Sequence, residues 1–211
     1  MKIKSALHIH VKGDPVDKIP YDFKELIDHA HKSNFKAIAI TCHNYISPIS
    51  KAKKYAEKKG ISIISGTEIE IQNKHIVALN PSKEILKIKS FEALRKYKLS
   101  HKKVFIIAPH PYFPALNCLH GKLEKHIDIF DAIEFNYFYT KTINFNKKAL
   151  RIAKKIQQAY NWNFGLSHVE NTLLHIFGNR NSRRTKTQRK KLFQKHQIKR
   201  HTNNNATVIC V

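Results

Sequence analysis

Histidine and acidic residues stand in this sequence where strands are predicted, and these residue types bind transition metals. His8 and His10 flank Ile9 in the first apolar stretch of the chain. Side chains two apart on a strand project from the same face, so the two imidazoles form a chelating pair. Taken alone, the pair is explained at least as well by a half-exposed strand that carries polar histidines on its solvent face.

The same arrangement recurs further along the chain. His43, Glu68 and His110 each follow a short apolar stretch that we interpret as a strand. In a parallel barrel the carboxyl ends of all strands meet at one rim, so these three side chains are predicted to converge. Imidazole and carboxylate groups are ligands for Zn, Fe and Mn, and a carboxylate such as Glu68 can bridge two ions about 3.5–4 Å apart.

The elements that must position these residues alternate between strand and helix. Short apolar runs predict strands, and apolar residues recurring at i, i+3, i+4 and i+7 predict helices. The predicted strands span residues 2–10, 36–41, 61–65, 68–71, 75–79, 104–108 and 132–135, and the predicted helices span 21–34, 48–60, 82–98 and 144–159. This order favours a βαβ series with a buried, largely parallel sheet. At 211 residues, an incomplete or compact α/β barrel fits better than a full barrel of about 250 residues.

The composition is that of a globular protein. Hydrophobic residues make up 42% of the chain and charged residues 26%, which argues against disorder. No apolar run approaches the roughly 20 residues of a membrane span, and no signal-peptide stretch follows Met1, so we expect a cytoplasmic protein without membrane contact. Three cysteines at unrelated spacings indicate reduced thiols. Cys118 has no partner at metal-ligand spacing and is expected to be an ordinary thiol.

The chain is strongly basic, with 39 Lys and Arg against 15 Asp and Glu and a formal net charge of +24. Such a field attracts phosphate groups, whether on nucleic acid or on a small phosphoester. A lysine-rich composition that merely solvates helix faces is an equally weighted explanation. Residues 179–200 hold ten of the Lys and Arg and almost no apolar periodicity. We therefore predict one domain over 1–178, followed over 179–211 by a basic tail or by a diverged last barrel unit.

Seven short motifs give the sequence a resemblance to a known family. They are LHIH at 7–10, TCHN at 41–44, GTE at 66–68, HIVAL at 75–79, HP at 110–111, EFN at 134–136 and SHVE at 167–170. In order and spacing they resemble the motifs of the polymerase and histidinol phosphatase (PHP) domain family. The resemblance covers about residues 3–178.

The resemblance implies a distorted (β/α)7 barrel, similar to a TIM barrel, that holds two or three divalent transition-metal ions (Zn, Mn or Fe) and hydrolyses phosphoesters. Carried over by position, the ligands fall into two sets around a bridging Glu68. One set is His8, His10, His168 and Glu170, and the other is Asp14, His43, His75 and His110. We expect Glu68, His43 and His110 to be catalytic. The ions would lower the pKa of a water so that hydroxide attacks phosphorus.

The sequence departs from the family pattern at two places. Cys42 stands where the family has Asp, so a carboxylate that would orient His43 or a water is replaced by a thiol. The closing Asp-x-His of the family becomes His168-x-Glu170, which reverses the order of the two donors. We expect the first change only to weaken the tuning of the site, whereas the second can leave its metal site occupied, altered or lost.

These observations lead to two functional hypotheses of different classes. The first is a metal-dependent phosphoesterase that acts on a phosphorylated small molecule or on a nucleic-acid end. The second is a catalytically impaired barrel that binds nucleic acid through its basic C-terminal segment. No residue pattern selects the substrate or the oligomeric state.

Overall fold

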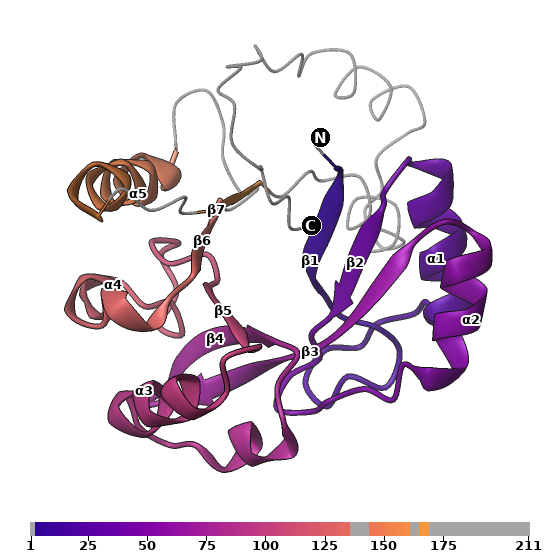
Figure 1. Ribbon diagram of the computed structural model, residues 1–211, viewed down its shortest axis with the longest axis horizontal. Helices are drawn as coiled ribbons and strands as arrows, with labels where there is room; N and C mark the ends of the chain where they lie inside the picture. Colours follow the sequence, from indigo (N-terminus) through magenta and orange to yellow (C-terminus); the bar gives the residue numbers. More distant parts are fainter. Residues whose placement is uncertain (1–2, 136–143, 161–164, 169–211) are drawn as a thin grey trace.

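The computed structural model describes residues 3–135, 144–160 and 165–168. The chain forms an α/β structure whose sheet curls, with the helices on its outer side (Figure 1). The elements in order are β1 (Ser5–Ile9), α1 (Phe23–Lys32), β2 (Ala37–Ile40), α2 (Ser50–Lys58), β3 (Ser62–Ile71), β4 (Lys74–Leu79), η1 (Lys83–Lys87), α3 (Phe91–Ser100), β5 (Phe105–Ala108), α4 (Gly121–Lys125), η2 (Ile127–Ile129), β6 (Ala132–Phe135), α5 (Asn146–Tyr160) and β7 (Gly165–His168).

The seven strands lie in one sheet in sequence order, from β1 to β7. β1, β2 and the first half of β3 pair in parallel, as do β5, β6 and β7. β4 is antiparallel to both of its neighbours. The expected largely parallel sheet is therefore confirmed, and β4 is the antiparallel strand among the described ones. In the part of the chain that the structure describes, β7 is not paired with β1, so the sheet is a curled half-barrel.

β4 reverses direction because a two-residue turn joins it to β3. Gln72 and Asn73 have φ angles of 50° and 58°, and positive φ at both central positions is typical of the type I′ turns that close tight hairpins. The reversal has a consequence for His75. An antiparallel strand begins at the edge where its parallel neighbours end, so a residue at the start of β4 reaches the same rim as residues that follow β2 and β5.

β3 is a single ten-residue strand, and the prediction of two strands separated at Gly66 and Thr67 is wrong. Gly66 lies inside this strand, and the position requires glycine because no larger side chain fits there. A Cβ atom at this position would stand 2.9 Å from both the Ala78 carbonyl oxygen and the Thr41 Cγ2 atom. At Gly66 the strand changes partner, from parallel β2 to antiparallel β4. Glu68 therefore lies within a strand and not beyond its end.

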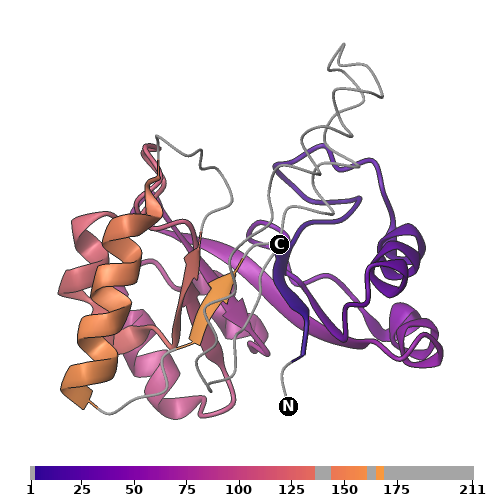
Figure 2. The same ribbon diagram turned by 90° about the horizontal axis from the view of Figure 1, so that it is seen from above.

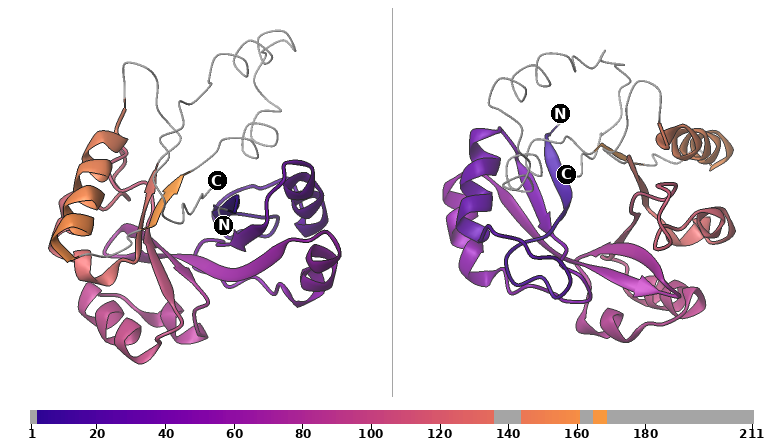
Figure 3. Two further views of the ribbon diagram at one scale, coloured as in Figure 1. Left: turned by 45° about the horizontal axis from the view of Figure 1, so that its top comes forward. Right: turned by 180° about the vertical axis from the view of Figure 1, so that it is seen from behind.

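The long strand β3 links two halves of the molecule, each with its own apolar core (Figures 2 and 3). Leu26, Ile27 and Ala30 of α1 pack on β1 to β3, while Phe91 and Leu94 of α3 pack on the second half. Both helices begin at sequence-encoded caps. At α1, Asp22 and Glu25 form a reciprocal capping box.

The Ser90 side chain caps α3 by accepting a hydrogen bond from the Ala93 amide. The predicted helix over 82–98 is divided at this point into η1 and α3. The residue that follows η1, Ile88, is extended, so the two helical segments cannot be continuous. No described helix is both long and apolar enough to cross a bilayer. The predicted basic segment 179–211 lies outside the described residues.

Candidate metal centre

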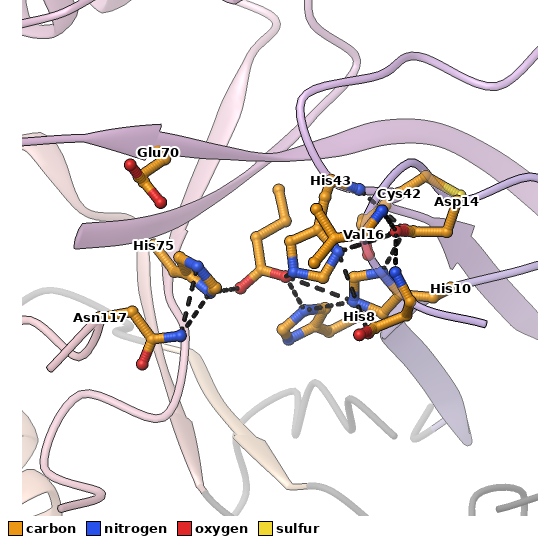
Figure 4. Close-up of polar contacts among 12 residues, drawn as sticks. His8, His10, Asp14, Val16, Cys42, His43, Glu70, His75 and Asn117 are labelled. Carbon is orange, nitrogen blue, oxygen red and sulfur yellow. Dashed lines mark hydrogen bonds and ion pairs between the residues drawn. The ribbon is translucent and has the colours of Figure 1, made fainter. Parts of the chain in front are cut away.

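Glu68 is the centre of a cluster of five histidines. Its side chain is 2% exposed. Oε2 lies 3.1 Å from His8 Nε2, 3.3 Å from His10 Nε2 and 3.1 Å from His43 Nε2. These three imidazoles come from β1, from the residue that follows it and from the loop after β2, and Figure 4 shows them turned toward one point.

The second oxygen of Glu68 faces a different pair of histidines. Oε1 lies 2.8 Å from His75 Nδ1 and 3.4 Å from His110 Nε2. Among the described residues this atom accepts no hydrogen bond of good geometry, although it is buried. A carboxylate whose two oxygens face separate groups of nitrogen ligands has the arrangement of a bridging ligand.

The strand order explains why residues far apart in sequence meet here. Glu68 lies on the strand that joins the two halves of the sheet, and His43 forms an isolated parallel bridge with it. The Glu68 amide also donates to the Thr41 and Cys42 carbonyl oxygens at 3.2 and 3.1 Å. The backbone therefore fixes the carboxylate against the end of β2. His110, which has a positive φ of 30°, follows β5 in the second half of the sheet.

Asp14 contacts two of the histidine rings at Nδ1, the nitrogen that faces away from Glu68. Its Oδ2 atom lies 2.7 Å from His10 Nδ1, and its Oδ1 atom lies 3.1 Å from His43 Nδ1. Oδ1 also accepts hydrogen bonds from the Val16 and Asp17 amides, which is typical of an aspartate that forms a turn. Because Nε2 of both rings faces Glu68, the Asp14 carboxylate is placed to hold Nδ1 protonated and the ring fixed.

Glu134 is placed to orient a third ring, that of His8, from the other half of the sheet. The sequence alone assigned Glu134 no role. Its Oε2 atom lies 3.2 Å from His8 Nδ1 and accepts a hydrogen bond from the His110 amide at 2.9 Å. The side chain is 5% exposed. Its place in the EFN motif at the end of β6 was the signal that could have found it. Asn136 of that motif lies outside the described residues.

The charges of this cluster are strongly coupled. Burial alone would lower the pKa of His8, but Glu68 and Glu134 outweigh it and hold that pKa well above its ordinary value. Burial likewise lowers the pKa of His110, while Cys118 and Glu68 raise it to about 10. Burial would raise the pKa of Glu68, but the neighbouring histidines, His8 first, hold it well below its ordinary value. The raised pKa values of His8 and His110 favour protonated imidazoles beside the Glu68 carboxylate.

Four overlapping groups of donors could hold an ion, since the ligand atoms of each lie within 4.8 Å of one another. They are His8, His10 and Glu68; His43, Glu68 and His75; His8, His110 and Glu134; and His10, Asp14, Asp17 and His43. The buried Glu68 Oε1 atom and the convergence of five imidazole nitrogens fit a divalent transition metal. Asp17 is the member of these groups that is not among the ligands expected from the sequence.

The substitution of Cys42 for Asp leaves His43 oriented. Asp14 lies against His43 Nδ1 and also accepts a hydrogen bond from the His43 amide at 2.9 Å. The Cys42 thiol is buried and accepts a hydrogen bond from the Ser47 hydroxyl at 3.3 Å. The carboxylate beside His43 in this chain is therefore that of Asp14.

The closing pair of the predicted site is only partly described. His168 is the last residue of β7 and is in register with Phe135 of β6, which places its backbone at the same edge of the sheet. Glu170 lies outside the described residues. Their part in metal binding stays a prediction.

Comparison with known proteins agrees with this geometry. The PHP domain family model matches residues 7–200. The uncharacterized protein MJ1587 of Methanocaldococcus jannaschii is 28% identical over 165 residues, which cover 74% of this chain and 95% of that protein. A PolC-type DNA polymerase III of Staphylococcus saprophyticus is 39% identical over 61 residues, which cover 29% of this chain and 4% of the polymerase.

Two solved structures share the fold. One is a two-domain protein of Bacteroides vulgatus that contains a predicted PHP-like metal-dependent phosphoesterase, with a TM-score of 0.51 and 19% identity over 78% of this chain and 50% of that one. The other, from Bifidobacterium adolescentis, is proposed to be a metal-dependent phosphoesterase and gives a TM-score of 0.55 with 14% identity over 72% of this chain and 84% of that one. With the family model covering most of its length, the chain belongs to the PHP domain family.

Proposed function

We propose that this protein is a metal-dependent phosphoesterase that hydrolyses a phosphomonoester or a nucleic-acid end. The observation that carries the proposal is the contact of both Glu68 oxygens with imidazoles from two halves of the sheet. Family membership and the two structural neighbours support it. Bound divalent ions, of which we propose two or three (Zn, Mn or Fe), would polarise phosphoryl oxygens and lower the pKa of an attacking water.

The residues of the chain have separate tasks in this proposal. His8, His10, His43, His75 and His110 would provide nitrogen ligands around a bridging Glu68. Glu134 would hold the His8 ring in place, and Asp14, which the resemblance implies as a ligand, would instead orient His10 and His43. Because Glu68 is buried and its neighbours are fixed by backbone hydrogen bonds, the ligands need little rearrangement to bind an ion. His168 and Glu170 would complete the set, in the distorted (β/α)7 barrel that the family resemblance implies.

An open pocket lies beside Asp14, although no residue of the histidine cluster lines it. Its volume is about 370 Å³, in the range of pockets that bind small molecules. Lys12, Phe23 and Tyr45 are among the residues that line it, and Gly13 and Pro15 on its wall flank Asp14 directly. A lysine and two aromatic rings suit an organic group that carries a phosphate, and the positive charge of the chain favours the approach of anions.

The proposal is tested by metal analysis and hydrolysis assays on the purified chain. We expect two or three equivalents of Mn, Fe or Zn, and release of phosphate from p-nitrophenyl phosphate or from the ends of short oligonucleotides. Competition between these two substrates ranks small molecules against nucleic acid. A chain that binds no metal and yet retains RNA would support the second candidate, a nucleic-acid-binding protein, which the ten basic residues of 179–200 favour.

A further inference from the structure

A cysteine lies against the cluster where the sequence predicted an ordinary thiol. Cys118 is 1% exposed, and its Sγ atom lies 3.1 Å from His110 Nδ1. The residue belongs to the loop between β5 and α4, and its amide donates to the Ala115 carbonyl oxygen at 3.2 Å. Eight residues separate the thiol from the histidine, a spacing that matches no metal-ligand motif, so the sequence gives no signal for the contact.

The neighbouring residue makes a parallel contact. Asn117 Nδ2 lies 3.3 Å from His75 Nε2, and the Asn117 carbonyl oxygen accepts a hydrogen bond from the His75 amide at 2.9 Å. Consecutive residues of one loop therefore contact the two histidines that face Glu68 Oε1. Figure 4 shows Asn117 beside His75 at this side of the cluster.

The position of the sulfur relative to the ring suggests its task. His110 turns Nε2 toward Glu68, at 3.4 Å, and presents Nδ1 to the thiol. A histidine that binds a metal through Nε2 carries its proton on Nδ1, and the acceptor of that proton fixes the tautomer and the ring orientation. Carboxylates are the acceptors for His8, His10 and His43. Among these four rings, only His110 has sulfur at Nδ1.

We propose that Cys118 is a positioning residue, whose sulfur accepts the Nδ1 proton of His110 and so directs Nε2 of that ring toward the metal at Glu68. The inference rests on the proposed function insofar as His110 binds metal. It differs from a packing role, in which the sulfur only fills space, and from direct ligation, in which the sulfur itself binds the ion.

Two substitutions of Cys118 distinguish a positioning role from a packing role, because the two roles predict opposite orders of Zn²⁺ affinity. Cys118→Ser keeps an acceptor, whereas Cys118→Val is apolar and offers none. If the sulfur positions His110, the Val variant should lose about 10- to 100-fold in Zn²⁺ affinity, measured by competition with a chelator, and the Ser variant should retain most of it. A packing role would reverse the order. Leu116→Ala is the matched control, since that side chain is 93% exposed on the same loop.

A spectrum of the Co²⁺-loaded protein tests direct ligation. Positioning predicts no sulfur-to-cobalt charge-transfer band in the near ultraviolet, and a band that disappears in Cys118→Ser would overturn the proposal. So would equal Zn²⁺ affinity of the wild-type and Val proteins. Either of these two results would leave the proposed function intact. A wild-type chain that binds no Zn²⁺ would contradict both the proposed function and the role of Cys118.

Discussion

His8 Nδ1 and Glu134 Oε2 lie 3.2 Å apart although 126 residues separate them. His8 belongs to the first strand and Glu134 to the sixth, so the contact exists because the sheet curls until its two halves face each other. The candidate centre is therefore a product of the whole sheet. A change in the strands that carry or precede Glu68, His110 and Glu134 should therefore alter the affinity for metal.

Glu68→Gln should abolish turnover and leave the fold intact. The amide has nearly the volume of the carboxylate but lacks the charge that holds the histidines. We expect metal affinity to fall by more than the roughly 10- to 100-fold loss that follows removal of a partner of a metal-bound histidine. Metal content, phosphate release and circular dichroism check this. Glu70→Gln, the same change on the exposed side chain two residues along β3, is the control. Activity of Glu68→Gln within a few-fold of wild type would remove Glu68 from the centre.

Glu134→Ala should weaken Zn²⁺ binding by about 10- to 100-fold, because His8 Nδ1 loses its acceptor. Glu134→Gln retains a carbonyl oxygen that can accept the same proton, so its loss should be smaller. Chelator competition measures both affinities, and thermal melting without metal shows whether the Ala variant remains folded. Wild-type affinity in a folded Ala variant would refute the orienting role.

Asp14→Asn should affect His10 and His43 together. One carboxylate serves both Nδ1 atoms, and an amide offers a single acceptor oxygen in its place. We expect metal affinity to fall and the Nδ1 proton resonances of both rings to shift in nuclear magnetic resonance spectra of the Zn²⁺-loaded protein. A shift of one ring alone would show that the two histidines are held independently.

The stability of the metal-free protein should fall as pH rises from about 6.5 toward 10. The folded-state pKa of His110 is raised to about 10, and that of His8 is also raised, over an unfolded value of about 6.5. A raised pKa contributes stability that is complete below the unfolded value and is lost as pH rises through the folded one. Melting temperatures measured with a chelator at pH 6.5 and pH 9 test this.

The affinity for Zn²⁺ should change in the opposite direction and increase with pH, because the metal binds neutral imidazole. His110→Gln should flatten the pH dependence of melting of the metal-free protein. An unchanged dependence in that variant would show that His110 does not contribute to it.

The basic segment should govern the salt dependence of any nucleic-acid binding. Neutralising Arg183, Arg184, Lys190 and Lys191 with Gln should reduce the slope of log affinity against log salt by about 0.7 for every phosphate of a single strand that these side chains neutralise. Fluorescence anisotropy with a labelled RNA measures the slope. An unchanged slope would assign these four side chains no role in phosphate binding.

The sequence predicted which histidines lie near Glu68 better than it predicted the elements that carry them. Strand periodicity placed His8 and His10 on one face, and the apolar runs located β2, β5 and β6. Gly66 was misleading, because glycine usually interrupts a strand and here it allows close packing against Ala78. The reversal of β4 depends on two residues with positive φ that form no strong turn motif.

The partners of the histidines were harder to predict, for a physical reason. Glu134 and Cys118 act on rings through the tertiary structure, and a contact between β6 and β1 leaves no periodic trace in the sequence. A metal ligand can be recognised by its residue type at a strand end. The residue that orients the ligand is identified only once both are placed in space.

The most direct test of the metal centre is an anomalous-scattering map from crystals grown with Mn²⁺ or Zn²⁺. A bridging Glu68 predicts at least two peaks within coordination distance of its carboxylate, one beside Oε2 with His8 and His10 and one beside Oε1 with His75 and His110. A saturated crystal with no peak at Glu68, or with peaks only elsewhere on the surface, would contradict the proposed metal centre.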